Sequence, residues 1–261
     1  MQMYRGVLTG CNEAFVIDGA MRRRLLDEDP SSADVIFPWL RGRDLKRWQT
    51  EPSGKFVIFT RRGIDIEKYP AIKRHLEQFK TRLEPRPRDW NPSYPGEKWA
   101  GRKAGSYKWY EIQDNIAYYK EFSKAKIIWP DMAQKMRVTF DTSTAFCGNT
   151  AYFFPTDDLF FLALFNSSVI AFWASKTLAV FQGDTFRFFS QNVSQFPIPL
   201  ADDAARQSLH NEVAAIIARV QADPAADITA QERKINELVY DLYGLTIQER
   251  DMIENDIRQR G

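Results

Sequence analysis

Short runs of apolar, aromatic and β-branched residues recur along the first part of the chain. They are KFVIFT at 55–60, AKIIW at 125–129, MRVTF at 136–140 and TAYFF at 150–154. Runs of this length, bounded by charged residues and turn formers, are typical of β-strands rather than helices. The pattern therefore predicts a strand at each of these places.

A different spacing marks residues 70–83. Pro70 is suited to the first position of a helix because its missing N–H would have no partner there. Apolar residues then recur every three or four positions as far as Leu83, before Pro85 and Pro87. This spacing predicts an amphipathic helix followed by a loop.

From Asp202 onward the composition changes to alanine, charged residues and helical spacing. One helix is predicted over residues 202–220. Two more are predicted to begin at capping boxes, in which a hydroxyl and a glutamate three residues later satisfy free backbone N–H groups. These boxes are Thr229 with Glu232, whose helix should stop at Gly244, and Thr246 with Glu249.

Together these elements predict an α+β fold. We expect a body with a mixed sheet and packed helices over residues 1–200. We expect a C-terminal helical tail over residues 201–261.

The most apolar stretch runs from residue 159 to 181. It is long enough to span a bilayer, but polar residues interrupt it from Asn166 onward. Two buried helical pieces joined near Asn166 fit the pattern better than a membrane span, with Thr156 and Asp157 as the cap. The N-terminus lacks the apolar segment of a signal peptide, and the two cysteines, Cys11 and Cys147, lie far apart. We therefore expect a cytoplasmic protein with no membrane contact.

The net charge of +2 conceals a strong asymmetry. Residues 41–140 contain 23 Lys and Arg against 12 Asp and Glu, whereas residues 138–261 contain 9 against 16. A basic middle region indicates an anionic partner on one part of the surface, such as a nucleic acid. Solvated helix faces or an acidic protein partner would also explain it.

The loop predicted over residues 85–108 is basic and contains several aromatic residues. It includes Asn91-Pro92-Ser93-Tyr94, one residue away from the Asn-Pro-Pro-Tyr tetrad with which amino-methylating DNA methyltransferases hold a flipped adenine. That tetrad follows a buried strand, whereas Asn91 follows PRPRDW. We interpret the match as a coincidence in a loop that contacts a partner.

Other catalytic arrangements are missing from the sequence. No glycine-rich turn after a strand is present to hold S-adenosylmethionine. No acidic-x-Lys motif follows Asp131 on the next strand, as a metal-dependent nuclease would need, and the two histidines fit neither a triad nor a zinc site. We therefore predict no catalytic residues, no metal site and no cofactor in this chain.

Several stretches, in order, resemble the TaqI-like C-terminal specificity domain, or target-recognition domain, of type IIG restriction-modification methylases. These stretches are RGVLTGCNEAFVID, FPWLRGRDLKRW, DIEKYPAIKRHLEQFKTRLEPR, YKWYEIQ, KIIWPDM, LALFNSSVIAFW, SQFPIPL and INELVYDLYGLTIQER. They cover nearly the whole chain.

The resemblance implies sequence-specific recognition of double-stranded DNA. It also implies a separate methyltransferase domain or subunit that binds S-adenosylmethionine and methylates adenine N6. The chain would begin about where that catalytic domain ends, and would itself be non-catalytic. The alternatives are a fragment that retains methyltransferase or nuclease activity, and a basic protein-interaction module.

Candidate DNA-binding residues follow from side-chain chemistry. Arg and Lys can bridge O6 and N7 of guanine, and Asn or Gln can bind adenine in the same way, whereas phosphate contacts supply affinity without sequence information. We predict base contacts from the polar connections that hold Gln134, Lys135, Arg137, Gln182, Asp184 and Arg187. We predict phosphate or groove contacts from Arg61, Arg62, Arg102, Lys103 and Lys108.

Overall fold

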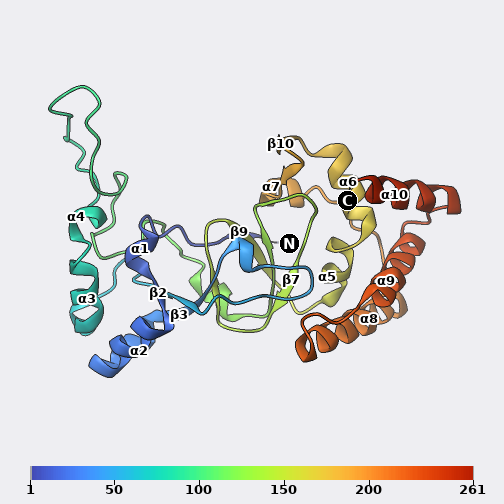
Figure 1. The fold of residues 1–261 in the computed structure, drawn as a ribbon, viewed down its shortest axis with the longest axis horizontal. Coiled ribbons are helices and arrows are strands. Elements are labelled where there is room, and N and C mark those ends of the chain that lie inside the picture. Colours follow the sequence, from blue (N-terminus) through green and yellow to red (C-terminus); the bar gives the residue numbers. More distant parts are fainter. Residues whose placement is uncertain (1, 261) are drawn as a thin grey trace.

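The computed structural model describes residues 2–260, except for the side chain of Gln182. The molecule is elongated (Figure 1). At one end lie helices α3 (Pro70–Glu77) and α4 (Lys80–Leu83), and at the other lie α8 (Asp203–Ala222), α9 (Thr229–Leu242) and α10 (Ile247–Gln259). Small sheets fill the middle. The predicted α+β fold is confirmed.

The central sheet has the strand order β1-β9-β5-β7 and is antiparallel throughout. Its strands are β1 (Tyr4–Arg5), β9 (Ala151–Pro155), β5 (Lys126–Pro130) and β7 (Thr139–Asp141). Every residue of β5 is buried, as its apolar run predicted.

The strand predicted at 136–140 begins only at Thr139. Val138 lies outside the sheet because other segments bind its main chain: its carbonyl accepts from the Trp48 N–H, and its N–H donates to the Asn166 side chain.

A second sheet has the order β2-β4-β3-β8. It consists of β2 (Val16–Asp18), β4 (Lys55–Ile58), β3 (Ile36–Leu40) and β8 (Phe146–Cys147), of which β8 runs parallel to β3. Helices α1 (Asn12–Phe15), α2 (Gly19–Glu28) and α3 share one hydrophobic core with it. The helix predicted over 70–83 is divided into α3 and α4, which are separated at Gln78 and Phe79.

The third sheet is small and exposed. Strands β10 (Val180–Gln182) and β11 (Thr185–Arg187) form a hairpin, and β11 pairs antiparallel with β6 (Met132–Ala133). Gly183 has a φ of +56° at the turn, a conformation that glycine adopts without steric cost. Because β11 pairs with β6, the hairpin is attached to the chain segment that directly follows β5.

The apolar run that starts at residue 159 forms two helices. They are α5 (Leu159–Phe165) and α6 (Ser168–Thr177), and they are bent by 56° at the break that holds Asn166. The predicted break is confirmed, but the cap is Asp158 rather than Thr156 and Asp157, since its side chain accepts from the Phe160 N–H. Within residues 2–260 no single helix is long and apolar enough to cross a membrane, although this bent pair passes the same test together.

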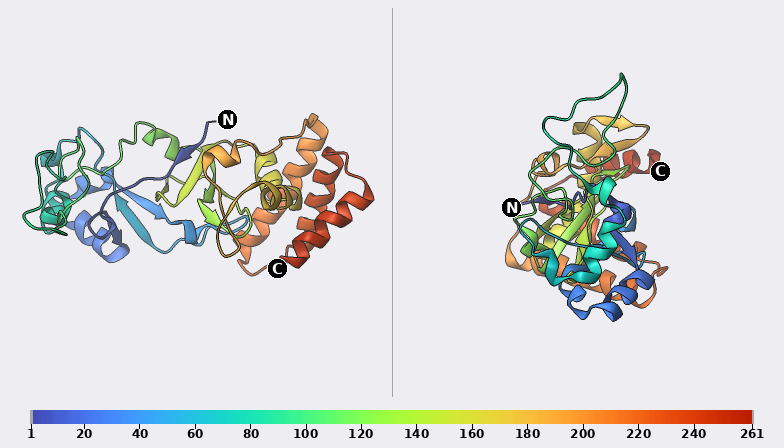
Figure 2. Two further views of the ribbon diagram at one scale, coloured as in Figure 1. Left: turned by 90° about the horizontal axis from the view of Figure 1, so that it is seen from above. Right: turned by 90° about the vertical axis from the view of Figure 1, so that its left-hand side faces the viewer.

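The C-terminal helices share a second hydrophobic core with α5 and α6, to which Ile235, Val239 and Ile253 contribute. Figure 2 shows the three helices grouped at one end of the molecule. The division at residue 200 stays a prediction. Short helices complete the chain: α7 (Ser190–Val193) and the 3₁₀ turns Pro30–Val35, Gly42–Asp44, Ile66–Lys68 and Tyr119–Ser123.

The two predicted capping boxes have different outcomes. Thr246 and Glu249 form the box at the start of α10, as expected. At α9 the prediction is wrong, because Ile228 is the N-cap and Glu232 instead accepts a hydrogen bond of 2.6 Å from the Trp48 indole N–H. The helix still ends before Gly244, whose φ of +64° lets the chain leave the helix.

Candidate nucleic-acid interface

A groove of about 440 Å³ opens beside the end of β5. Its walls come from Asn12, from the 3₁₀ turn Gly42–Asp44 with Arg41 before it, and from Asp131, Met132 and Arg137. The turn can approach the sheet closely because Gly42 lacks a side chain; a Cβ there would lie 2.8 Å from the Thr150 carbonyl oxygen. Three arginines (Arg41, Arg43 and Arg137) and one carboxylate (Asp131) thus share one groove.

The charged side chains of the groove have different surroundings, which shift their pKa values in different directions. Arg41 forms a salt bridge of 2.7 Å with Asp44, and the hydrogen bonds between them raise the pKa of the guanidinium. Burial raises the pKa of Asp131, although Arg187 and Arg5 act in the opposite direction. Burial also lowers the pKa of Arg137. Polar groups in the groove are therefore partly desolvated before any ligand arrives.

The exposed hairpin β10–β11 adjoins this groove, because Met132 belongs both to the groove wall and to the same small sheet. Phe181 is 52% exposed and Met132 41% exposed. The Arg187 guanidinium lies 3.7 Å from the centre of the Phe181 ring and 5.1 Å from that of Phe189. Such stacking fixes the position of a cation while leaving its N–H groups available.

Arg102 has a structural role rather than the predicted contact role. It is 4% exposed, and its guanidinium donates to five main-chain carbonyls, those of Thr9, Leu83, Lys108, Trp109 and Glu111. It also lies 4.4 Å from the centre of the Tyr107 ring. Burial lowers its pKa to about 10. We therefore reassign Arg102 from phosphate contact to the support of its loop.

Arg62 is similarly engaged. Its guanidinium donates to the Ser106 hydroxyl and to the Gln113 carbonyl, each at 2.8 Å, so it also holds this loop. Lys103 and Lys108 are exposed, and so is Arg61, whose guanidinium lies over the Tyr119 ring. These three remain available to a phosphate.

The remaining predicted residues lie on or near the small sheet. Gln134 is exposed, and Lys135 is half-buried beside a small cavity that Arg47 and Asn166 also line. Asp184 is exposed at the hairpin turn. Gln182 belongs to β10, but its side chain lies outside the described part of the structure. The structure thus brings together the two groups predicted to contact bases, which are more than forty positions apart in the sequence.

The basic loop (residues 85–108) and the hairpin project from the same side of the molecule, the loop near one end and the hairpin nearer the middle (Figures 1 and 2). Apart from the bridge between Pro85 and Arg102, the loop contains no strand pairing within the described residues. Asn91 donates only to the nearby Asp89 carbonyl, and Tyr94 is 62% exposed. Residues 86–90, which lead into Asn91, form no strand, so the tetrad-like sequence lacks the setting that adenine binding requires.

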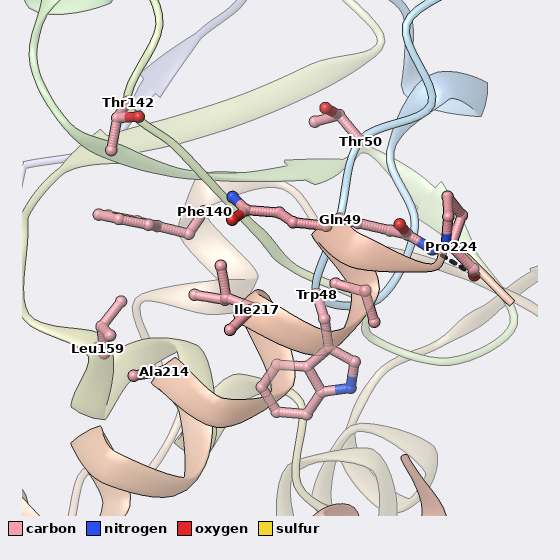
Figure 3. A pocket seen from close by; sticks show the side chains of 12 residues that line it. Trp48, Gln49, Thr50, Phe140, Thr142, Leu159, Ala214, Ile217 and Pro224 are labelled. Atoms are coloured by element: carbon pink, nitrogen blue, oxygen red, sulfur yellow. Dashed lines mark hydrogen bonds between the residues drawn. The ribbon is translucent and has the colours of Figure 1, made fainter. Parts of the chain in front are cut away.

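A larger cavity, of about 520 Å³, lies between the turn at residues 46–50 and α8 (Figure 3). Trp48, Leu159 and Ile217 contribute apolar walls, and the Gln49 side chain donates to the Pro224 carbonyl at 3.2 Å. None of the lining side chains is acidic, basic or a thiol. This cavity offers no acid-base chemistry.

The sequence matches the family model described as the TaqI-like C-terminal specificity domain over residues 37–198. The chain belongs to this family. The matched range begins within β3 and includes the groove arginines, the basic loop, β5 and the whole hairpin. The matched range therefore holds the groove residues except Asn12, together with both projecting segments.

Comparison with solved structures supports the fold. The type IIL restriction-modification enzyme MmeI, whose structure was determined in complex with DNA, matches with a TM-score of 0.68 and 14% identity over 99% of this chain. The type IIG restriction endonuclease BpuSI matches with a TM-score of 0.47 and 15% identity over 92% of the chain. The chain spans 35% and 30% of these two proteins. A search of curated proteins by sequence returned no match.

Sequence reasoning missed several groove residues. Arg41, Arg43 and Asp131 were not among the predicted contacts, although Asp131 directly follows a predicted buried strand. Side chains at the end of such a strand often line a site, and this position was the available signal. Asn12 and the Arg41–Arg43 segment gave no comparable signal, because only the tertiary fold brings them to the end of β5.

Proposed function

We propose that this specificity domain recognises a sequence in double-stranded DNA and positions that DNA for a separate catalytic domain. The observation that carries the proposal is the arginine-lined groove continuous with the exposed hairpin, in a chain of the TaqI-like specificity family. The MmeI match agrees with this, since that enzyme was solved with DNA. The hairpin and the basic loop would contact the duplex at two places on one side of the molecule.

The catalytic partner is part of the same proposal. A methyltransferase domain or subunit would bind S-adenosylmethionine and transfer the methyl group to adenine N6, and the specificity domain would contribute no reacting group. The complete system would be a type IIG-like restriction-modification enzyme of the cytoplasm.

A salt titration tests DNA binding directly. We expect the chain to bind a fluorescently labelled mixed-sequence duplex at low salt, with affinity falling steeply between about 50 and 200 mM salt as counterions are released. Replacing both Lys135 and Arg137 by alanine should weaken binding and flatten the salt dependence. Lys234→Ala, on the exposed face of α9, is the matched control and should change neither.

Two results would contradict the proposal. Failure to bind any duplex at low salt would remove DNA as the ligand. Unchanged DNA affinity in the Lys135 and Arg137 double variant, together with retained folding, would favour a module that docks on an acidic protein.

A further inference from the structure

Among the described residues Arg137 has no hydrogen-bond or salt-bridge partner, whereas Arg41 in the same groove has one. Arg41 is held by its salt bridge to Asp44. The Arg137 Nε is buried and has no hydrogen-bond partner, and no ion pair or hydrogen bond engages its guanidinium within residues 2–260. A desolvated donor without a partner costs about 1–3 kcal/mol. The terminal Nη groups of Arg137 are not among the buried atoms, so they can donate to an acceptor in the groove that this side chain lines.

Asp131 offers the complementary chemistry on the same groove. Its main chain is held on both sides, since its N–H donates to the Thr150 carbonyl at 2.9 Å and its carbonyl accepts from the Phe188 N–H at 2.8 Å. Its carboxylate forms no salt bridge within the described residues. The position of this acceptor is therefore set by the sheet, whereas its hydrogen-bonding capacity remains available.

The Asp131 carboxylate lines the same groove as Arg137 and does not suit a phosphate. It would repel the phosphate and reduce the benefit of the arginines. The major-groove edge of a base pair, in contrast, presents acceptors and a donor side by side: guanine offers O6 and N7, and cytosine offers its N4 amino group. Arginine matches the first and aspartate the second.

We propose that Arg137 and Asp131 together read one G·C base pair, with Arg137 donating to guanine O6 and N7 and Asp131 accepting from cytosine N4. This inference rests on the proposed function, because it requires DNA in the groove. Met132 continues the same surface toward the hairpin, so the base pair lies beside the part of the duplex that Phe181 and Arg187 contact.

Selection from a randomised duplex library tests the inference. The wild-type chain should enrich a motif with a fixed G·C pair. Arg137→Gln alone should weaken that preference, and Arg137→Gln combined with Asp131→Ala should move the position toward A·T, because glutamine pairs with adenine N6 and N7 and no carboxylate then faces thymine O4. Asp131→Ala should relax the same position. Each change should alter the preference for that base pair by about ten- to a hundredfold and leave other positions unchanged.

The controls separate this inference from the proposed function. Lys103→Ala, in the exposed part of the basic loop, should lower recovery without altering the motif, and thermal melts should show that the variants are folded. If Arg137→Gln does not fold, Arg137→Lys replaces it and should retain guanine with weaker preference. A wild-type chain that enriches nothing overturns DNA recognition itself. A motif that is unchanged in folded Arg137 and Asp131 variants, or a uniform loss across all sequences, overturns the base-pair assignment alone.

Discussion

Removal of the Arg102 guanidinium should loosen the base of the basic loop. We consider Arg102→Met, which keeps most of the side-chain length but removes every donor. Five main-chain carbonyls would lose their bond to Arg102, and they belong to three separate segments: Thr9, Leu83 and residues 108–111. The Thr9 and Lys108 carbonyls would each keep one backbone N–H donor. No neighbouring side chain can replace a planar group with five donors.

The magnitude follows from these contacts. Hydrogen bonds to charged groups contribute about 1.5–3 kcal/mol each, so five of them would equal the stability of a whole domain, about 5–15 kcal/mol. The real loss must be smaller, because the carbonyls gain water once the loop opens and because the burial cost of the guanidinium disappears. We expect the free energy of unfolding to fall by about 3 kcal/mol.

Urea denaturation measures that change, and hydrogen exchange locates it. The amides near residues 84–113 should exchange faster in Arg102→Met while the amides of β5 stay protected. Lys103→Met is the matched control, since Lys103 is the exposed neighbour in the same loop. A loss below about 1 kcal/mol, with unchanged exchange in the loop, would refute the assignment of Arg102 as its support.

Three further outcomes are expected. His75 donates to the Ala14 carbonyl, and burial lowers its pKa below the usual 6.5. The unfolded chain therefore binds the proton more readily, and the stability of the folded chain should decrease as pH falls through 6.5. The variant His75→Gln should flatten that decrease in pH-dependent melts. Glu232→Ala should lower the free energy of unfolding, measured by urea denaturation, by about 2 kcal/mol, because Trp48 and Arg47 both lose this acceptor. Glu232→Gln keeps an acceptor for Trp48, so a similar loss in that variant would show that the Trp48 hydrogen bond contributes little. Calorimetry with S-adenosylmethionine should give no binding heat, and measurable binding would reverse the assignment of the cofactor to another domain.

The predictable parts of the fold are those set by local sequence. Strand β5 was recognisable because consecutive apolar residues suit a strand buried on both faces. The break at Asn166 was recognisable because polar residues interrupt an apolar run. At α9, by contrast, Glu232 has the spacing of a capping box but binds Trp48, 184 positions away in the sequence. Tertiary contacts of this kind leave no local pattern.

The candidate site shows the same limit. Arg102 and Lys103 are adjacent in a basic, glycine-containing stretch, and their sequence surroundings are almost identical. One is buried under five carbonyls and the other is exposed. The charge pattern alone identifies a basic region. Only the fold distinguishes Arg102, which supports the loop, from Lys103, whose side chain is exposed.

The hairpin has buried residues that attach it to the core and exposed residues that do not, so the two groups differ in which substitutions they can accept. Phe186 and Phe188 attach it to the core at 5% and 0% exposure, whereas Phe181 and Asp184 face outward. Substitutions at the outward positions would therefore leave the attachment intact. Under the proposed function, the target sequence could therefore be altered at these outward positions without loss of the fold.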